Sequence, residues 1–256
     1  MLTLIGLGLW DEFDISLKTM LRIKKADRVY IELYTSKWYG NLKRLEKIIG
    51  KEVEILDRKD LEEKSDKILE EAKDKDVVIF VPGDPLIATT HVSLLSNAKK
   101  MGIDVEVIHN ASIYSAIGET GLHVYKFGAT VTIPFLEKTN EFLPFSIYEK
   151  IKENKRNDLH TLILLDVISE EKKYMTPNQG MKILLKTEEA MRKKIFTEDT
   201  EVVVFTRAGS KGPMIVYGKV KDMINEDFGS PPFVIIAPSR LHFTEKEYLE
   251  YHRVGK

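Results

Sequence analysis

The sequence VVIFVPGDP, residues 77–85, decides the fold of this chain. Its first five residues form an apolar run, which predicts a buried strand. Pro82 and Pro85 then stop the strand, and Gly83 lets the backbone turn. We therefore expect Asp84 in a rigid loop at the carboxyl end of a strand, the edge at which open α/β sheets bind ligands. The same residue types are common in simple turns, so the loop alone does not establish a site.

A glycine loop after the first predicted strand supports the ligand-binding interpretation. Gly6-Leu7-Gly8 follows the predicted strand at residues 2–5 and first suggests a dinucleotide site. Such a site needs a third glycine three residues after the second, and Asp11 stands at that position. An acid there would repel a pyrophosphate.

Glu32 keeps the dinucleotide alternative open. It falls near the place of the acid that binds the ribose in such sites, about 20 residues beyond the glycines. A NAD-dependent oxidoreductase therefore stays among the alternatives. The simpler prediction for Glu32 is an exposed acid at a strand end.

The order of elements predicts an α/β fold made of two domains. In the first half, strand patterns alternate with helical patterns, which predicts a mostly parallel sheet with helices on both faces. The strands are expected at residues 2–5, 28–34, 53–56, 77–81 and 105–108, and one charged helix at 59–72. In the second half, strands are expected at residues 129–133, 159–166, 201–206, 215–220 and 233–237, with helices at 146–153 and 177–193. Glycines cluster between the halves, so we place an N-terminal α/β domain at 1–120 and a C-terminal α/β domain at 121–256.

Composition limits the possible classes of protein. The 256 residues carry 39 basic and 40 acidic side chains, a balance that argues against a protein that coats nucleic acid. There is no cysteine, which excludes disulfides, thiolate metal sites and cysteine nucleophiles. No apolar run approaches the roughly 20 residues that span a bilayer, and the first residues do not look like a signal peptide. We expect a soluble cytoplasmic protein.

The six histidines do not predict a metal site or a catalytic group. No two of them show the short helical spacing of zinc ligands. No nucleophile, base and orienting residue stand at a recognisable spacing. We therefore predict no metal ligand and name no catalytic residue. His91, at the start of a predicted helix, is expected to have a structural or capping role.

Seven ordered blocks of sequence resemble a known family. They are IGLGLWDE at 5–12, PGDPLIATTH at 82–91, SIYSA with GLHVYKFG at 112–116 and 121–128, LHTL at 159–162, YMT at 174–176, TRAGS at 206–210 and EDFGSPP at 226–232. The chain thereby resembles the S-adenosylmethionine-dependent methyltransferases typified by the tetrapyrrole methylases. The first loop continues as Leu9-Trp10-Asp11-Glu12, without the further glycines and prolines of the tetrapyrrole branch, which favours the diphthine synthase branch.

The resemblance implies a cofactor site. It implies two α/β domains with S-adenosylmethionine in the cleft between them, and a homodimer. The family's cofactor contacts map onto Leu9, Asp84, Ile87, Ser112, Ile113, Leu165, Ala208 and Phe233. Most of these are apolar and would act through backbone groups and shape. Asp84 is the candidate carboxylate for the amino-acid end or the sulfonium. Asp166 is a substrate-side candidate, with a helix cap or turn residue as the alternative.

The resemblance also implies the reaction. The enzyme would methylate the amino group of a modified histidine in translation elongation factor 2, leaving S-adenosylhomocysteine. Three alternatives remain open beside the oxidoreductase: a methyltransferase of the same class that acts on a tetrapyrrole, one that acts on RNA, and a binding module with a dead cleft.

Overall fold

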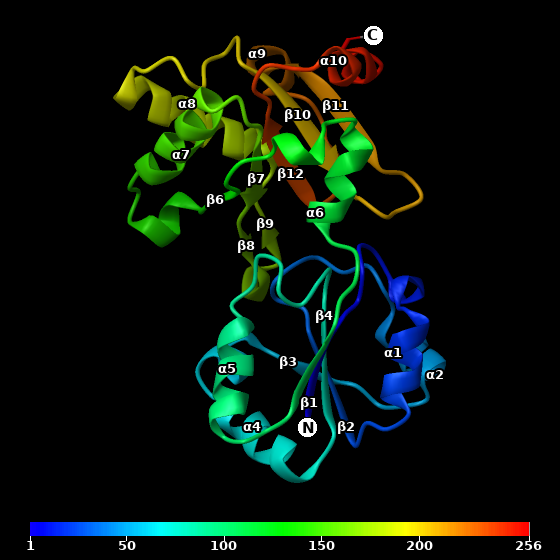
Figure 1. Cartoon of the computed structure of the whole chain (residues 1–256). Helices are drawn as coiled ribbons and strands as arrows, with labels where there is room; N and C mark the ends of the chain where they lie inside the picture. The colour runs from blue at the N-terminus through cyan, green and yellow to red at the C-terminus, as the bar shows by residue number, and fades with distance from the viewer. Residues whose placement is uncertain (256) are drawn as a thin grey trace. The chain divides into compact units, whose positions relative to one another are not determined.

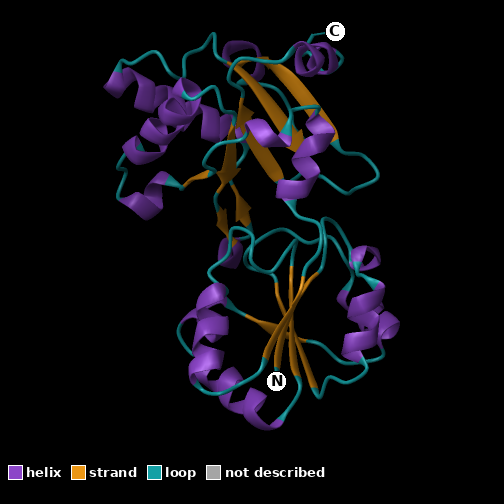
Figure 2. Ribbon diagram, in the orientation of Figure 1, coloured by secondary structure: helices purple, strands orange, loops and turns teal. Residues whose placement is uncertain are grey.

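The computed structural model describes residues 1–255 (Figures 1 and 2). The chain divides into two compact units, Met1–Ala116 and a second unit that begins at Ile117. Each unit is built on its own five-stranded sheet, and a separate two-stranded sheet completes the strands of the described residues. The two α/β units agree with the predicted fold class.

The sheet of the first unit is parallel throughout. Its strands are β1 (Leu2–Gly6), β2 (Arg28–Glu32), β3 (Glu54–Leu56), β4 (Val77–Val81) and β5 (Val105–Ile108), in the spatial order β3-β2-β4-β1-β5. Gly6 pairs with Val81, so β1 and β4 end at the same level. The loops that follow β1, β4 and β5 therefore emerge at one edge of the sheet.

Helices cover both faces of this sheet (Figure 2). They are α1 (Leu17–Ile23), α2 (Leu42–Ile49), α3 (Arg58–Glu62), α4 (Ser65–Asp74), α5 (Val92–Lys100) and the short α6 (Ile113–Ala116). Strand β4 shows why: Val77 and Ile79 pack in the core with α4 and α5 residues, whereas Val78 and Phe80 pack with α1 and α2 residues. Successive side chains on a strand point to opposite faces, so a fully apolar strand needs cover on both.

The prediction of one helix over residues 59–72 is wrong, because two helices, α3 and α4, occupy this region. Asp57 and Asp60 form a capping box at the start of α3. The second helix begins at Ser65, after an N-cap residue, Lys64, that makes no side-chain capping bond. The charged pattern of the segment conceals this break.

The second sheet is mixed. Its strands are β6 (Val131–Ile133), β7 (Thr161–Leu165), β10 (Glu201–Thr206), β11 (Met214–Lys219) and β12 (Phe233–Ala237), in the order β11-β10-β12-β7-β6. Only the pairing of β6 with β7 is parallel among these strands. The helices are α7 (Phe145–Arg156), α8 (Pro177–Met191), α9 (Val220–Met223) and α10 (Phe243–Glu250). The hairpin of β8 (Val167–Ile168) and β9 (Lys173–Tyr174) and the short α9 were not predicted.

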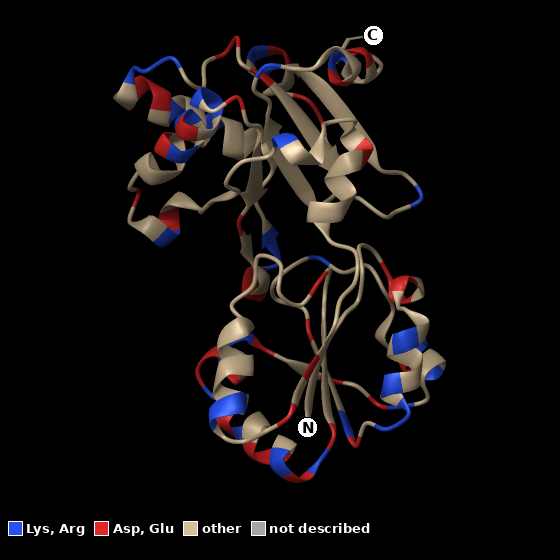
Figure 3. Ribbon diagram, viewed as in Figure 1, with Lys and Arg blue, Asp and Glu red and all other residues tan. Residues whose placement is uncertain are grey.

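Charged residues of both signs occur along the helices and loops of both units (Figure 3). The central strands carry few of them, since they form the buried layers. This distribution agrees with the near balance of 39 basic and 40 acidic residues.

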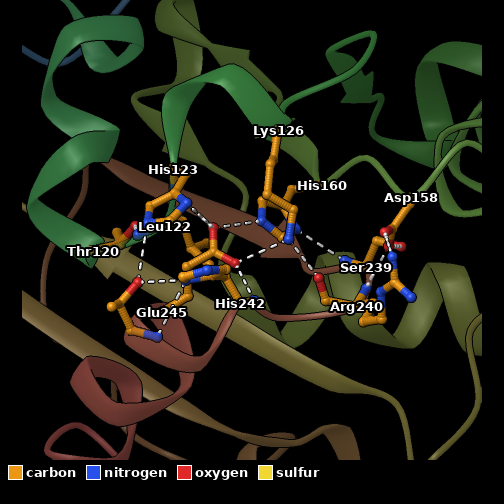
Figure 4. A network of polar contacts seen from close by, with 11 residues as sticks. Thr120, Leu122, His123, Lys126, Asp158, His160, Ser239, Arg240, His242 and Glu245 are labelled. Carbon is orange, nitrogen blue, oxygen red and sulfur yellow. Dashed lines mark hydrogen bonds and ion pairs between the residues drawn. The ribbon is translucent and has the colours of Figure 1, made fainter.

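A buried carboxylate holds the C-terminal helix in the second unit (Figure 4). Glu245 of α10 is fully buried and accepts hydrogen bonds from the backbone N–H groups of His123 and His242, each at 2.7 Å. It also accepts from Nε2 of His160 at 3.1 Å and Nζ of Lys126 at 3.0 Å. The backbone N–H of Ser239 donates to Nδ1 of His160, so Nε2 carries the proton. This one side chain therefore joins α10 to segments more than a hundred residues earlier.

Replacing Glu245 with Gln should destabilise the protein at neutral pH. The amide nitrogen would face groups that themselves donate, which costs about 1–3 kcal/mol of unfolding free energy. Burial opposes the charge, but the bonds from His123, His242, His160 and Lys126 lower the pKa of Glu245 from 4.5 to about 2. A lowered pKa contributes stability that is present above pH 4.5 and is lost as the pH falls toward 2.

Urea unfolding followed by circular dichroism from pH 7 to pH 3 measures this effect. The gap between Glu245→Gln and the unsubstituted protein should be large at pH 7 and shrink with acidification. Glu247→Gln, an exposed position on the same helix, is the matched control and should unfold normally. A gap that does not change with pH would contradict this role of the carboxylate.

Candidate functional site

The loops after β1 and β4 are joined by their own backbones. Gly8 N–H donates to Gly83 O at 3.2 Å, and Gly83 N–H donates to Gly8 O at 2.8 Å. Both glycines have positive φ, +82° and +70°, which is the left-handed region that glycine adopts without strain. Strands β1 and β4 are neighbours whose connections run in opposite directions along the sheet, so their carboxyl ends form its topological switch point. The paired glycines thus lie where open α/β sheets bind ligands.

A third loop closes onto these two. Asn110, two residues beyond β5, donates from Nδ2 to Gly6 O at 3.0 Å and to Asp14 O at 2.9 Å. A Cβ atom added to Gly6 would lie 2.5 Å from Gly83 O and 2.7 Å from Cβ of Asn110. Because there is no room for a side chain, Gly6 lets the three loops meet.

Asp84 organises the same edge. Its side chain is buried, and Oδ1 accepts from the Leu86 N–H at 3.0 Å. Oδ2 accepts from the Asn110 N–H at 3.2 Å and bonds to Nδ1 of His109 at 2.8 Å. The carboxylate therefore ties the loop after β4 to the loop after β5. Its role as the carboxylate that meets the cofactor stays a prediction.

The structure brings together the five predicted site residues of the first unit. Leu9 follows the paired Gly8, and the Ile87 N–H donates to Asp84 O at 3.3 Å. Ser112 is buried and caps α6, accepting from the Tyr114 N–H at 3.3 Å. Ile113 begins that helix. These residues share the carboxyl edge of the first sheet.

The other three predicted residues gather at one edge of the second sheet. Leu165 ends β7, Phe233 begins the antiparallel β12, and Ala208 lies two residues beyond β10. The register pairs Thr206 with Phe233 and Leu164 with Val234, which places these three chain segments side by side. Phe233 and Ala208 are buried and Leu165 packs on the same core, so the edge is largely apolar.

Thr206 adds a polar group at this second edge. Its hydroxyl is buried and has no hydrogen-bond partner within residues 1–255. A buried polar atom without a partner is uncommon, because it loses its bonds to water without replacement. The unpaired hydroxyl beside three apolar residues fits a ligand pocket that is mostly apolar with few polar anchors.

Asp166 bonds to the loops that follow β6 and β7. Oδ2 accepts from the Phe135 N–H at 3.0 Å, while Oδ1 accepts from Lys138 Nζ at 2.9 Å and from the Val167 N–H at 2.8 Å. These bonds fix the loops after β6 and β7, in agreement with the turn-residue alternative. A contact with substrate stays a prediction.

The buried His91 ring contacts the Pro-Gly-Asp-Pro loop at Pro85. The side chain is only 2% exposed; Nδ1 lies 3.1 Å from Pro85 O and Nε2 lies 3.4 Å from the Tyr34 hydroxyl. Burial lowers the pKa of His91, which favours the neutral ring. The ring makes no capping bond to α5, so its role is structural, and Tyr34 is a partner that the sequence did not reveal.

The prediction of an exposed Glu32 is wrong, because its side chain is fully buried at the end of β2. It accepts from the N–H groups of Tyr34 and Thr35 at 3.0 and 3.1 Å and from the Thr35 hydroxyl at 2.5 Å. Burial raises its pKa from 4.5 to about 7, although the bonds from Thr35 and Tyr34 act in the opposite direction. The carboxyl group is therefore engaged and not presented to a ribose.

The first loop also differs from a dinucleotide site. Asp14 fills the space above Gly8, where an added Cβ would lie 2.5 Å from Cβ of Asp14. A 3-10 turn, η1 (Glu12–Asp14), follows the loop, and α1 begins only after its cap Ser16. A pyrophosphate site needs a helix N-terminus directly at the glycine loop. Both features disfavour the oxidoreductase alternative.

Residues 1–255 lack both a metal-binding cluster and a membrane-spanning helix. They contain no group of three or more His, Cys, Asp or Glu side chains that could hold a metal ion. No helix in the described part of the chain has the length and apolar character needed to cross a membrane.

Comparison with known proteins relates this geometry to one family. The family Tetrapyrrole (Corrin/Porphyrin) Methylases matches residues 1–224. The chain is 50% identical over 254 residues to a diphthine synthase of Methanocaldococcus jannaschii, with 98% of each chain covered. It is 46% identical over 252 residues to a diphthine synthase of Methanococcus aeolicus, covering 98% of this chain and 97% of the relative. A solved structure described as a diphthine synthase superimposes with a TM-score of 0.85 at 37% identity, covering 98% of this chain and 95% of the other.

Replacing Gly6 with Ala should force the three loops apart. The added Cβ would meet backbone and Asn110, which cannot move without shifting a strand end. We expect a loss of about 1–3 kcal/mol of unfolding free energy, the usual cost of overpacking. Affinity for S-adenosylhomocysteine, measured by calorimetry, should fall as well.

Gly212→Ala is the matched control for this substitution. Gly212 also has an ordinary φ, but a Cβ there meets nothing within 4 Å. The control should leave stability and ligand affinity unchanged. Equal behaviour of the two variants would contradict the close packing at Gly6.

Glu32 should make stability depend on pH in the neutral range. Its pKa is raised in the folded state, so the contribution is complete below pH 4.5 and is lost as the pH rises through 7. Relative to Glu32→Gln, the protein should lose stability between pH 5 and pH 8, at about 1.4 kcal/mol per pKa unit at most. Chemical denaturation across this range, with the exposed Glu52→Gln as control, measures the difference. A constant difference between the two proteins would argue against a buried, protonated Glu32.

Proposed function

The chain belongs to the tetrapyrrole (corrin/porphyrin) methylases, and from that premise we propose that it is a diphthine synthase, which methylates the amino group of a modified histidine in translation elongation factor 2. The family membership confirms the resemblance seen in the sequence blocks and the prediction of an S-adenosylmethionine-dependent methyltransferase. The proposal rests on the similarity to diphthine synthases, which extends over nearly the whole of this chain and of each relative.

The sheet edge of each unit, taken by itself, has features that suit S-adenosylmethionine. When bound, this cofactor supplies an electrophilic methyl group on a sulfonium. It has no phosphate, and the first loop, with Asp14 packed on Gly8, offers no cradle for one. Its adenine and methionine parts need apolar surface and a few polar anchors. At the edge of the second sheet, Leu165, Ala208 and Phe233 are apolar, and the buried Thr206 hydroxyl beside them has no partner within residues 1–255.

The chain would act mainly by binding and orientation. Methyl transfer to an amine is an in-line displacement, so holding the two reacting groups in register can contribute an effective molarity of about 10⁵–10⁸ M. The loops after β1, β4 and β5 are fixed by backbone bonds and by Asp84, so they are ordered before any ligand arrives. A rigid, preformed edge costs little entropy when the ligand binds.

The protein substrate, the subcellular location and the oligomeric state are also proposed. We propose that the elongation factor docks as a protein substrate in the cytoplasm and that the enzyme works as a homodimer. The near balance of charge supports a protein rather than a nucleic acid as the substrate, because a nucleic-acid enzyme would carry a basic excess.

Labelling with methyl-marked S-adenosylmethionine tests the proposal. Elongation factor 2 that bears the unmethylated precursor should acquire label, and a factor whose target histidine is replaced should not. Mass spectrometry then counts the methyl groups. Label on RNA or a tetrapyrrole alone would overturn the substrate, and a failure to bind S-adenosylhomocysteine would overturn the cofactor.

The affinity for S-adenosylhomocysteine tests the role of Asp84. Asp84→Ala leaves the Leu86 and Asn110 N–H groups without their acceptor, at a cost of about 1–3 kcal/mol per buried group. We expect an affinity for S-adenosylhomocysteine that is about tenfold weaker or worse. Asp104→Ala, at an exposed position of the same unit, is the control. Unchanged affinity in Asp84→Ala would contradict the role of this carboxylate in the cofactor site.

A further inference from the structure

His109 and Asp84 form a pair at the carboxyl edge of the first sheet. His109 directly follows β5, and its side chain is 67% exposed, whereas that of Asp84 is 7% exposed. Nδ1 of His109 lies 2.8 Å from Oδ2 of Asp84. The N–H groups of Leu86 and Asn110 hold the carboxylate in place. An exposed imidazole is thus anchored to a fixed, buried acid.

This geometry determines which ring nitrogen is free. A carboxylate only accepts hydrogen bonds, so Nδ1 carries the proton and donates it to Asp84. Nε2 then keeps its lone pair, and within residues 1–255 it has no hydrogen-bond partner. His91 and His160 differ, because both are buried and both of their ring nitrogens are engaged. Among these three, only His109 presents an accepting nitrogen to solvent.

The proposed reaction needs such a nitrogen. An aliphatic amine is mostly protonated at neutral pH, since its pKa is about 8–10. A protonated amine has no lone pair with which to attack a methyl group. Each methyl group transferred therefore requires the loss of one proton from the acceptor nitrogen.

We propose that His109 is the general base that deprotonates the acceptor amine, oriented by Asp84; this inference rests on the proposed function. Nε2 takes a proton from the ammonium nitrogen, and the freed lone pair forms the bond to the methyl carbon. The carbon–sulfur bond breaks, its electron pair stays on sulfur, and S-adenosylhomocysteine leaves. The imidazolium then gives its proton to water, and the cycle repeats for the next methyl group.

The surroundings of His109 suit this exchange of a proton. Asp84 stabilises the imidazolium and fixes the ring, as the acid does in other base–orienter pairs. Asp14, a further acid at this edge, is engaged elsewhere, because its Oδ2 accepts from the Trp10 N–H at 2.7 Å and its carbonyl oxygen accepts from Asn110 Nδ2 at 2.9 Å. Asp84 is therefore the titratable group in contact with the ring. The exposure of His109 allows proton release to solvent.

Two substitutions separate a base from a positioning residue. His109→Ala removes both ring nitrogens. His109→Asn places an amide N–H near the position of Nδ1, so it keeps the bond to Asp84 and lacks only the accepting Nε2. Single-turnover methyl transfer to elongation factor 2 is measured with saturating S-adenosylmethionine from pH 6.5 to pH 9.5. Affinity for S-adenosylhomocysteine is measured on the same proteins by calorimetry.

A general base predicts that both variants lose rate at neutral pH by about 10²–10⁴-fold, the usual contribution of such a group. The affinity of His109→Asn for S-adenosylhomocysteine should stay within about twofold of the original, since this variant keeps the bond to Asp84 and with it the fixed loops. The deficit should shrink as the pH rises, because the amine then loses its proton to solvent.

Three results would overturn the inference. A normal rate in His109→Asn would show that only the bond to Asp84 matters. A deficit that is the same at every pH would exclude proton removal as the impaired step. A deficit explained entirely by lost affinity would assign His109 to cofactor binding. An unsubstituted protein that transfers no methyl group to the elongation factor would instead overturn the proposed function, and with it the base.

Discussion

The two hydrogen bonds between Gly8 and Gly83 are the constraint on which the site depends. They join the loops after two neighbouring parallel strands at the switch point of the sheet. Their geometry needs positive φ at both positions, and Gly6 must lack a side chain for Gly83 and Asn110 to approach. Asp84 then ties in the loop after β5. The edge is thus held by backbone bonds between the glycines and by the side chains of Asp84 and Asn110.

This arrangement suits a reaction that depends on orientation more than on charge. A phosphate-binding loop presents open N–H groups at a helix start, whereas here Asp14 and Asn110 occupy the space around Gly8. The second unit offers apolar residues and one unpaired hydroxyl at the edge of its own sheet. In the proposed mechanism, His109 at the first edge, held by Asp84, removes a proton from the acceptor amine. Asp84 would thus have two roles, because it fixes the loops and orients His109.

Much of the fold could be predicted from the sequence, because it follows from local patterns. The apolar run at β4, its two prolines and the glycine loop after β1 are each visible within a few residues. Asn110 could not be found in this way, since its bond to Gly6 spans 104 positions. The burial of Glu32 depends on N–H groups of a turn that the sequence does not reveal. The strands β8 and β9 have two residues each, too few to show a period.

Amide hydrogen exchange, with and without S-adenosylhomocysteine, tests most directly the central claim that the interlocked loops of the first unit hold the cofactor. We expect slower exchange on binding in residues 7–9, 83–88 and 110–113, with little change in the helices that cover the sheet. Calorimetry on the same sample establishes that the ligand is bound. Saturating ligand with unchanged exchange in all three loops would contradict the account.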